Sequence, residues 1–510
     1  MSQNDKKGKK KSATLTRRNF LGAASTAAAA FTIVPRHVLG GAGYQAPSDM
    51  VHVAGIGVGA QGAGDIQNVC DPDVPVERPQ RSRTGQPLTP EEIAEQENQR
   101  AARQSQMAQQ GGGPPQGAPP PQQNQQEREP RKLADIYALC DVDSQYAGYL
   151  FQSYPKAKIY SDWREMLEKE PSIDAVVIAT PDHNHAPIAA AFMKEKKHVY
   201  VEKPMAKTVY ECRRLAEIAK EYNVVTQMGN QGHASEGARR TVEWVQGGVI
   251  GLVREVHIWT DRPAGWWPQG DLTRPEGVSV PNYLNWNVWL GPAPEKPYHP
   301  DICHFVWRGL RDYGTGAMGD MGAHIFDAPI WALNLGYPTK IQTSSTPYSD
   351  EYWPLAEMIT YEFPSRGYMP SVKVVWYDGG LMAPRPSELE PGRSVSSAVY
   401  YGDKGVMFSG NARMPELVPA DANFTGPDPW IPRTGDIFED WINAIKNGKK
   451  SSNDFSYSAK VTEIMLLTNI AVLTQRSNTT LDYDAENMKI TNLPEANNFF
   501  HYEYRKGWTL

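Results

Sequence analysis

Hydrophobic residues in the first half of the chain gather in short continuous runs that alternate with amphipathic stretches. A run of four to six apolar residues is typical of a strand buried on both faces of a parallel sheet. Intervening stretches with helical periodicity predict helices that cover the two faces. We therefore predict a doubly wound α/β sheet that ends near residue 230, with strands at 51–56, 136–140, 158–160, 175–179, 198–201 and 224–228 and helices at 145–154, 163–169, 186–195 and 209–222.

The pattern changes after residue 230. Apolar and polar residues alternate in segments 253–260, 357–363 and 372–376, which is typical of strands with one exposed face in an antiparallel sheet. Helices are predicted at 238–246, 436–447 and 459–476. The N-terminal domain, a Rossmann-type parallel sheet at 46–230, is thus expected to precede an α+β domain at 231–510 with a largely antiparallel sheet that binds the substrate.

A long polar segment, residues 73–131, interrupts the first domain between its first helix and its second strand. It includes a Gln-Gly-Pro stretch at 109–115 and a Pro-Gln stretch at 119–123. Such a composition offers too little apolar surface to offset the entropy of ordering the chain. We expect a disordered surface insertion.

The first 45 residues have the layout of an export signal followed by a linker. Five lysines precede the twin arginines Arg17 and Arg18, and an alanine-rich apolar stretch follows at 22–34. This order predicts a Tat signal, a periplasmic or otherwise exported protein and the Tat machinery as a partner. The alternative is a basic tail on an amphipathic helix. The apolar stretch is too short to favour a permanent membrane span, and no other stretch approaches that length.

Charge and cysteine content exclude other classes. After residue 45 the chain holds 44 basic and 57 acidic residues, a net charge of about −13, so nucleic acid is not an expected partner. Four scattered cysteines indicate neither a disulfide scaffold nor a CxxC metal site.

A glycine-rich turn follows the first apolar run. Gly57, Gly59 and Gly62 have GxGxxG spacing, which permits a tight turn, lets backbone amides approach a pyrophosphate and packs helix on strand. An acidic residue normally follows about 20 positions later and holds the ribose hydroxyls. Here Asp141 comes 79 residues after Gly62, and the insertion accounts for the excess. The pattern predicts a bound dinucleotide, and Asp141 favours NAD over NADP because its charge would repel a 2′-phosphate.

Two clusters carry groups suited to proton transfer. Glu202-Lys203-Pro204 follows a strand directly, at the sheet edge where open α/β folds bind ligands, and a lysine there can stabilise charge on a substrate oxygen. Asp320 and His324 are four residues apart, so a helix would present both on one face, where the carboxylate can orient the ring and raise its basicity. The alternatives are a solvated lysine, a capping aspartate and a buried histidine. No third ligand is evident, so no metal site is expected.

A third cluster follows the strand at 175–179 and lies at the same edge. It reads Thr180-Pro181-Asp182-His183-Asn184-His185. We expect Thr180, Pro181, His185 and the nearby Glu202 to meet the cofactor, and we expect His183 to be exposed.

Together these residues resemble the Gfo/Idh/MocA oxidoreductase family, which includes glucose–fructose oxidoreductase and inositol dehydrogenase. The resemblance covers nearly all of residues 50–475, and the insertion is a departure that leaves the glycine turn intact. It implies that Lys203, Asp320 and His324 form the catalytic group. Segment 285–292 and the start of the chain resemble a secreted subgroup from carbohydrate-degrading bacteria.

Three hypotheses follow. The first is an NAD(H)-dependent oxidoreductase that transfers hydride between nicotinamide and a hydroxyl of a sugar, polyol or glycoside, with aromatics of segment 262–267 stacking on the sugar. The second is a redox-assisted glycoside hydrolase or lyase with tightly bound, recycled NAD. The third is an exported sugar-binding protein that keeps the cofactor as structure. A carbohydrate substrate and a homo-oligomer are expected.

Overall fold

Two β-sheets organise the protein in a computed structural model that describes residues 50–74, 76–82, 85, 87–109, 131–410, 412–421 and 423–510. The predicted export signal and the Gly- and Pro-rich part of the insertion lie outside these residues. Within them, no helix combines the length and the apolar character that a membrane crossing needs.

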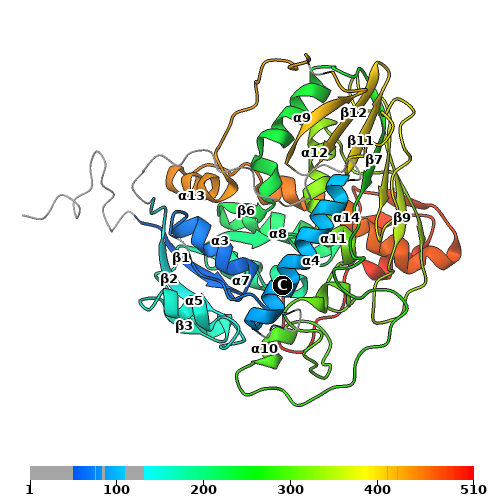
Figure 1. Ribbon diagram of the computed structural model, residues 1–510. Helices are drawn as coiled ribbons and strands as arrows, with labels where there is room; N and C mark the ends of the chain where they lie inside the picture. The colour runs from blue at the N-terminus through cyan, green and yellow to red at the C-terminus, as the bar shows by residue number, and fades with distance from the viewer. Residues whose placement is uncertain are drawn as a thin grey trace, which may run out of the picture. The chain divides into compact units, whose positions relative to one another are not determined.

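The first sheet has six strands in the order β3-β2-β1-β4-β5-β6, and all neighbouring strands are parallel (Figure 1). This is the strand order of a doubly wound dinucleotide-binding fold. The continuous apolar runs become strands that are buried on both faces, as in β4, where all four residues are buried. The predicted parallel sheet is confirmed, with strands β1 (His52–Ile56), β2 (Asp135–Cys140), β3 (Lys158–Tyr160), β4 (Ala175–Ile178), β5 (His198–Glu202) and β6 (Thr226–Gly229).

Helices connect these strands as the periodicity predicts. The clearest boundary is at α8, where Thr208 and Glu211 form a capping box and Asn223 ends the helix in the left-handed conformation. Helix α7 begins four residues before its predicted start, because burial of residues 182–186 outweighs the hydrogen bond lost at Pro187. The helices are α3 (Gln61–Cys70), α5 (Gly148–Ser153), α6 (Trp163–Lys169), α7 (Asp182–Lys194) and α8 (Val209–Tyr222).

The insertion differs from the expectation of disorder over 73–131. Residues Pro90–Gln109 form helix α4. Thr89 and Glu92 form a reciprocal cap, since the Glu92 N–H donates to Thr89 Oγ1 (3.3 Å) and the Thr89 N–H donates to Glu92 Oε2 (2.8 Å). The segment has a low apolar content but is rich in Ala, Glu, Gln and Arg, which have high helix propensity. A composition that cannot form a core can still form a helix.

The second sheet has nine strands in the order β13-β12-β11-β7-β10-β9-β8-β14-β15. Only the β7–β10 pair is parallel among its described pairs, so the expected largely antiparallel sheet is confirmed. Its strands are β7 (Val253–Trp259), β8 (Lys340–Ser345), β9 (Glu357–Phe363), β10 (Val372–Tyr377), β11 (Ala398–Gly402), β12 (Gly405–Gly410), β13 (Arg413–Val418), β14 (Leu481–Asp484) and β15 (Lys489–Ile490).

Helices and one long loop cover the two faces of this sheet. On one face pack α9 and α14, and on the other Leu389 and Val395 of the loop after β10 pack on Val375, Val399 and neighbouring strand residues. The remaining helical segments are η2 (Gln231–Ala234), α9 (Glu236–Gln246), α10 (Trp286–Leu290), η3 (Val306–Gly309), α11 (Gly316–Ile325), α12 (Asp327–Ala332), α13 (Ile437–Asn447), α14 (Phe455–Thr474), η4 (Gln475–Ser477) and η5 (Pro494–Phe499).

The last two long helices also complete the first domain. Helix α13 lies beside α3, as Figure 1 shows. Helix α14 packs against α8. Trp441 of α13 is fully buried with its ring 5.7 Å from that of Tyr200 on β5. The chain beyond residue 230 therefore builds the second sheet and also supports the first, where the cleft lies.

Candidate active site

The glycine-rich turn between β1 and α3 has the geometry that a dinucleotide requires. Gly57 adopts φ +77°, and a Cβ there would come within 2.8 Å of the Ala179 backbone. A Cβ on Gly62 would lie 2.2 Å from the Gly57 carbonyl oxygen, so only glycine lets α3 pack this closely on the turn. Ala60, at the helix N-cap, has no side-chain oxygen to accept the first N–H groups of α3.

An aromatic ring covers the second glycine. A Cβ on Gly59 would lie 2.1 Å from the ring of Tyr146. That ring stacks on His304 at 4.0 Å between centroids, and the guanidinium of Arg81, from the insertion, lies 4.6 Å from the Tyr146 centroid. Sequence reasoning did not predict this stack, because Arg81 and His304 each lie more than 60 residues from Tyr146 in the chain.

Asp141 directly follows β2 at the same end of the cleft. Its carboxylate accepts the N–H of Asp143 (2.9 Å) and is also hydrogen-bonded by the Gly59 backbone. Burial raises the pKa of Asp141 to about 6. The carboxylate therefore lies beside the glycine turn, at the end of β2.

The segment after β4 supplies one side of the cleft. Thr180 and Pro181 line it, and Thr180 Oγ1 is buried without a hydrogen-bond partner among the described residues. His185 also lines the cleft, but its ring nitrogens lie 2.8 Å from the carbonyl oxygens of Pro204 and Thr180, so it holds two turns together. Burial lowers the pKa of His185 to about 4. The expectation that His183 is exposed is wrong: it is fully buried, with Nε2 2.9 Å from the Trp289 carbonyl oxygen.

Lys203 and Asp320 meet across the cleft from different elements. Lys203 follows β5, Asp320 lies on α11, and Lys203 Nζ donates to Asp320 Oδ1 at 3.0 Å and to its carbonyl oxygen at 2.9 Å. Asp320 also accepts hydrogen bonds from Arg262 and Arg308. Burial raises the pKa of Asp320, but these three cations outweigh it and hold the pKa well below its usual range. The carboxylate stays ionised and fixes the lysine.

His324 lies one turn after Asp320 on α11, as predicted, but its hydrogen-bond partner differs from the expected one. Its Nδ1 lies 3.2 Å from Asn230 Oδ1, while the Asp320 carboxylate is bound to the lysine and the arginines. Burial, reinforced by the positive charge of Lys203, lowers the pKa of His324 to about 3. The ring is therefore neutral and able to accept a proton at Nε2.

Glu202 lies at the cleft floor, close to a second buried acid that sequence reasoning missed. Asp65 of α3 is buried, and burial together with the charge of Glu202 raises its pKa well above the usual range. Burial likewise raises the pKa of Glu202 to about 7. Its Oε1 accepts from Gln231 Nε2 at 3.2 Å and its Oε2 accepts the Lys203 N–H at 3.2 Å. Two adjacent buried acids disfavour double ionisation.

The cleft has a volume of about 720 Å³ and runs from the glycine turn to α11. Arg262, Trp266 and Arg308 also line the cleft, and they were not among the predicted catalytic or cofactor residues. Trp266 is 40% exposed, whereas Trp267 is buried and donates to Gln269. Of the aromatics in segment 262–267, Trp266 is thus the one placed to meet a ligand.

These features fit a dinucleotide. The close backbone turn, the uncapped start of α3 and the buried Thr180 Oγ1 all present donors to one cleft, and Asp141 lies at the end of β2. Across the described ranges, no three His, Cys, Asp or Glu side chains gather closely enough to hold a metal ion.

Two family models match the chain in tandem. Residues 118–230 match "Oxidoreductase family, NAD-binding Rossmann fold", and residues 243–362 match "Oxidoreductase family, C-terminal alpha/beta domain". The second match contains Asp320 and His324, and the first contains Asp141 and Lys203. The glycine turn precedes the first match, on the other side of the insertion.

Known relatives and solved structures agree with this match. The chain is 33% identical over 169 residues to a levoglucosan dehydrogenase of Pseudarthrobacter phenanthrenivorans, covering 33% of this chain and 34% of the relative. It is 31% identical over 126 residues to glycosyl hydrolase family 109 protein 1 of Shewanella sp. strain ANA-3, covering 23% and 27%. The matched part of the chain thus spans about a third or less of the length of these relatives. An NAD-binding protein from Listeria innocua shares the fold, with 13% identity and a TM-score of 0.50 over 85% of this chain and 97% of that one.

Proposed function

We propose that this chain is a member of the Gfo/Idh/MocA oxidoreductase family, whose models match two of its segments, and that it transfers a hydride between NAD and a hydroxyl-bearing carbon of a sugar, polyol or glycoside. The observation that carries the proposal is the meeting of Lys203, Asp320 and His324 at the carboxyl edge of the parallel sheet. These residues line the same cleft as the glycine turn and Asp141. When bound, NAD supplies the acceptor for the hydride.

The residues of the chain accept the hydroxyl proton of the substrate and stabilise the charge that it leaves. His324 is neutral and accepts the hydroxyl proton of the substrate while Asn230 holds Nδ1 of the ring. Lys203 faces the same space and stabilises the negative charge that develops on the substrate oxygen. Asp320 positions Lys203 through two hydrogen bonds from one ammonium group, so its role is orientation.

The cofactor end favours NAD. Asp141 is suited to accept hydrogen bonds from two ribose hydroxyls, and a 2′-phosphate would meet its negative charge. Thr180 Oγ1 and the first N–H groups of α3 provide neutral donors for the rest of the cofactor.

A second function rests on the similarity to a glycosyl hydrolase family 109 protein. In this alternative a glycoside would be oxidised transiently by hydride transfer to NAD and the aglycone would leave by elimination. Water would then add to the resulting double bond in a hydrolysis, and the hydride would return to the sugar. The cofactor is then recycled in place and no net NADH forms.

The twin arginines Arg17 and Arg18 support a further element of the proposal, export through the Tat pathway to the periplasm or beyond. Free nicotinamide cofactor is scarce outside the cytoplasm. An exported enzyme of this kind needs a cofactor that is bound before export and retained, in keeping with the stack that covers Gly59.

The test begins with native mass spectrometry of the purified full chain, which should show bound NAD or NADH. Sugars and aryl glycosides are then screened for absorbance change at the nicotinamide and for released aglycone. Lys203→Met should slow hydride transfer about 10²–10³-fold. Lys220→Met, at an exposed position on α8, is the matched control and should behave as wild type.

Release of aglycone without net NADH would favour the second function over the first. A protein that binds no nicotinamide cofactor, or a Lys203→Met variant with full turnover, would overturn the proposal.

A further inference from the structure

The substrate end of the cleft holds more positive charge than its catalytic role requires. Lys203, Arg262 and Arg308 all approach the single carboxylate of Asp320. Their side chains are 14%, 24% and 22% exposed, so water screens them only in part. One cation is enough to pair Asp320, and two additional guanidinium groups in the same place repel each other and the lysine.

The neighbouring acids reach these cations unequally. Asp182 is the other carboxyl near Arg308; it is buried, accepts the Thr315 hydroxyl at 2.6 Å, and burial raises its pKa to about 6. The Glu202–Asp65 pair can carry one further negative charge, and that charge acts on Lys203. Among the described residues, the two guanidinium groups share a single hydrogen-bonded carboxylate, that of Asp320.

Both arginines are held in place by aromatic side chains. The guanidinium carbon of Arg262 lies 4.0 Å from the Trp266 ring centroid, and that of Arg308 lies 4.4 Å from Trp307 and 4.6 Å from Phe305. Stacking fixes the plane of a guanidinium while leaving its edge available. A site built only to pair Asp320 does not need this fixation.

Part of each guanidinium is left for a ligand. Arg262 donates to Asp320 through Nη1, and Arg308 donates through Nε to Asp320 and through Nη1 to the Phe305 carbonyl oxygen. Among the described residues, no acceptor contacts Nη2 of either arginine. Both residues line the cleft together with His324, which makes them candidates to contact a bound substrate.

We propose that Arg262 and Arg308 form an oxyanion subsite, and that the substrate is a sugar bearing a carboxylate, such as a uronic acid unit. A planar carboxylate matches the fork of donors on a guanidinium and pairs with its positive charge. Sugar sulfates and phosphates share this oxyanion chemistry and are separate arms of the test. The inference deepens the proposed function and rests on it for the identity of the reaction.

The experiment measures binding and turnover separately. The NAD-loaded full chain is titrated calorimetrically with glucuronate and galacturonate, with their methyl esters and with the parent neutral sugars. Each acid should bind about 10- to 100-fold more tightly than its ester, the range for hydrogen bonds to a charged group. The preference should decline with added salt, because both partners are partly solvated. Sulfated and phosphorylated sugars should bind less tightly than the carboxylates.

Variants assign the preference to the two arginines. Arg262→Gln and Arg308→Gln should each reduce the ratio of acid to ester affinity about tenfold, and Arg308→Lys, which keeps the charge but loses the fork, should give an intermediate ratio. The exposed Arg254→Gln on β7 is the control and should keep the wild-type ratio. Melting temperatures establish that each variant folds.

The subsite would be overturned if the esters bound as tightly as the acids, or if a sugar sulfate or phosphate bound best. It would also be overturned if both glutamine variants kept the wild-type ratio of acid to ester affinity. Variants that lost NAD affinity as much as acid affinity would place the arginines at the cofactor. Acids that bind but are never oxidised would overturn the proposed function alone. Neutral sugars oxidised without any preference for acids would overturn the subsite alone.

Discussion

His324 is a neutral, half-buried imidazole whose Nδ1 lies 3.2 Å from the amide oxygen of Asn230. The residue pattern alone suggested a carboxylate partner that would raise the basicity of the ring. Instead, Asp320 is occupied by three cations, and burial of His324 lowers its pKa to about 3. The predicted pair of residues is present, but Asp320 does not raise the basicity of His324. Two arginines from other elements, together with Lys203, hydrogen-bond to its carboxylate instead.

A first prediction concerns this residue. His324→Ala should lower the single-turnover rate of hydride transfer about 10²–10⁴-fold, with little change in NAD affinity. The base form of a group with a pKa near 3 is present throughout pH 5–8, so the wild-type rate should show no ionisation of His324 in that window. His299→Ala, outside the cleft, is the control. A neutral ionisation that disappears only in the His324 variant would contradict this account.

A second prediction concerns Asp141. Asp141→Ala should weaken NAD binding far more than NADP binding, because NAD loses ribose hydrogen bonds while NADP also loses a repulsion. Fluorescence titration with both reduced cofactors measures the ratio. Asp135→Ala, at the half-exposed start of the same strand, is a suitable control. Equal losses for the two cofactors would remove Asp141 from the ribose site.

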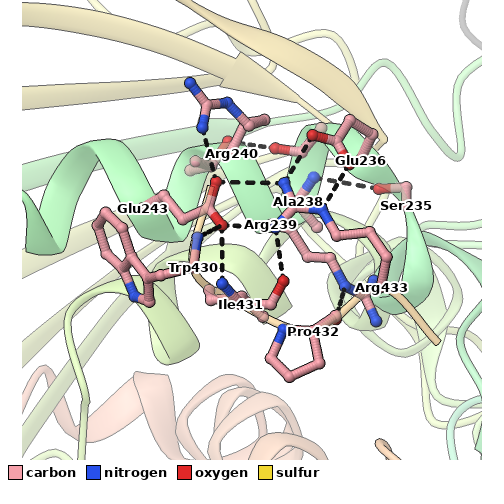
Figure 2. A network of polar contacts seen from close by, with 12 residues as sticks. Ser235, Glu236, Ala238, Arg239, Arg240, Glu243, Trp430, Ile431, Pro432 and Arg433 are labelled. Carbon is pink, nitrogen blue, oxygen red and sulfur yellow. Dashed lines mark hydrogen bonds and ion pairs between the residues drawn. The ribbon is translucent and has the colours of Figure 1, made fainter. Parts of the chain in front are cut away.

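At the scale of elements, one buried carboxylate on α9 holds the chain that leads into α13. The Glu243 side chain is fully buried and accepts the N–H groups of Trp430 and Ile431, each at 2.9 Å, as Figure 2 shows. It also receives Arg240 at 2.9 Å and Arg433 at 2.6 Å. The network matters to the site because α13 follows directly, and its Phe438 lines the cleft.

Glu243→Ala should therefore lower the free energy of unfolding by about 3–5 kcal/mol, since it leaves two arginines without their buried partner. Urea unfolding measures this. Glu236→Gln removes only the half-exposed contact to Arg433, where side chains are 51% and 32% exposed, and should cost less than about 1 kcal/mol. Similar losses in the free energy of unfolding of the two variants would show that burial of the Glu243 carboxylate does not determine its contribution to stability.

A pH-dependent pair lies in the second sheet. Glu357 on β9 and Asp378 after β10 are both buried; burial and the charge of Asp378 raise the pKa of Glu357, and burial raises that of Asp378 to about 7. The folded state thus retains a proton that the unfolded chain releases near pH 4. The stabilising effect of this retained proton is complete below pH 4 and is lost as the pH rises through 7.

Glu357→Gln should reduce this pH dependence, because the amide keeps a donor toward Asp378 but does not titrate. For one proton the difference between wild type and variant amounts to at most about 1.4 kcal/mol per pH unit between pH 4 and 7. Unfolding curves across that range provide the measurement, with the exposed Glu362→Gln on the same strand as the control. The same pH dependence of the free energy of unfolding in all three proteins would contradict the assignment of this titration to the Glu357–Asp378 pair.

For the whole molecule, the insertion can be removed at its base. The Asp73 carboxylate accepts the Arg131 backbone N–H at 2.8 Å, and the Leu133 N–H donates to the Cys70 carbonyl at 2.7 Å, so the two ends lie side by side. Replacing residues 74–130 by a short glycine linker should leave folding intact, as judged by circular dichroism and melting temperature.

The same deletion should weaken NAD binding about 2- to 30-fold, because it removes the Arg81 guanidinium from the Tyr146 ring that covers Gly59. Arg81→Ala should reproduce this loss without the deletion. An aggregated deletion variant, or a deletion with unchanged affinity while Arg81→Ala weakens binding, would contradict the role given to the insertion.

The sequence by itself determined the class of each sheet, the strands of the first sheet and the glycine turn, because these depend on local periodicity. It also indicated Asp141 and Lys203 at strand ends and Asp320 and His324 one helical turn apart. Only the tertiary structure decided which groups pair. The cations around Asp320, the Asn230–His324 contact, the Asp65–Glu202 pair and the stack on Tyr146 join residues far apart in the chain. No periodicity encodes such contacts, since they arise when separate elements pack around one cleft and exclude water from it.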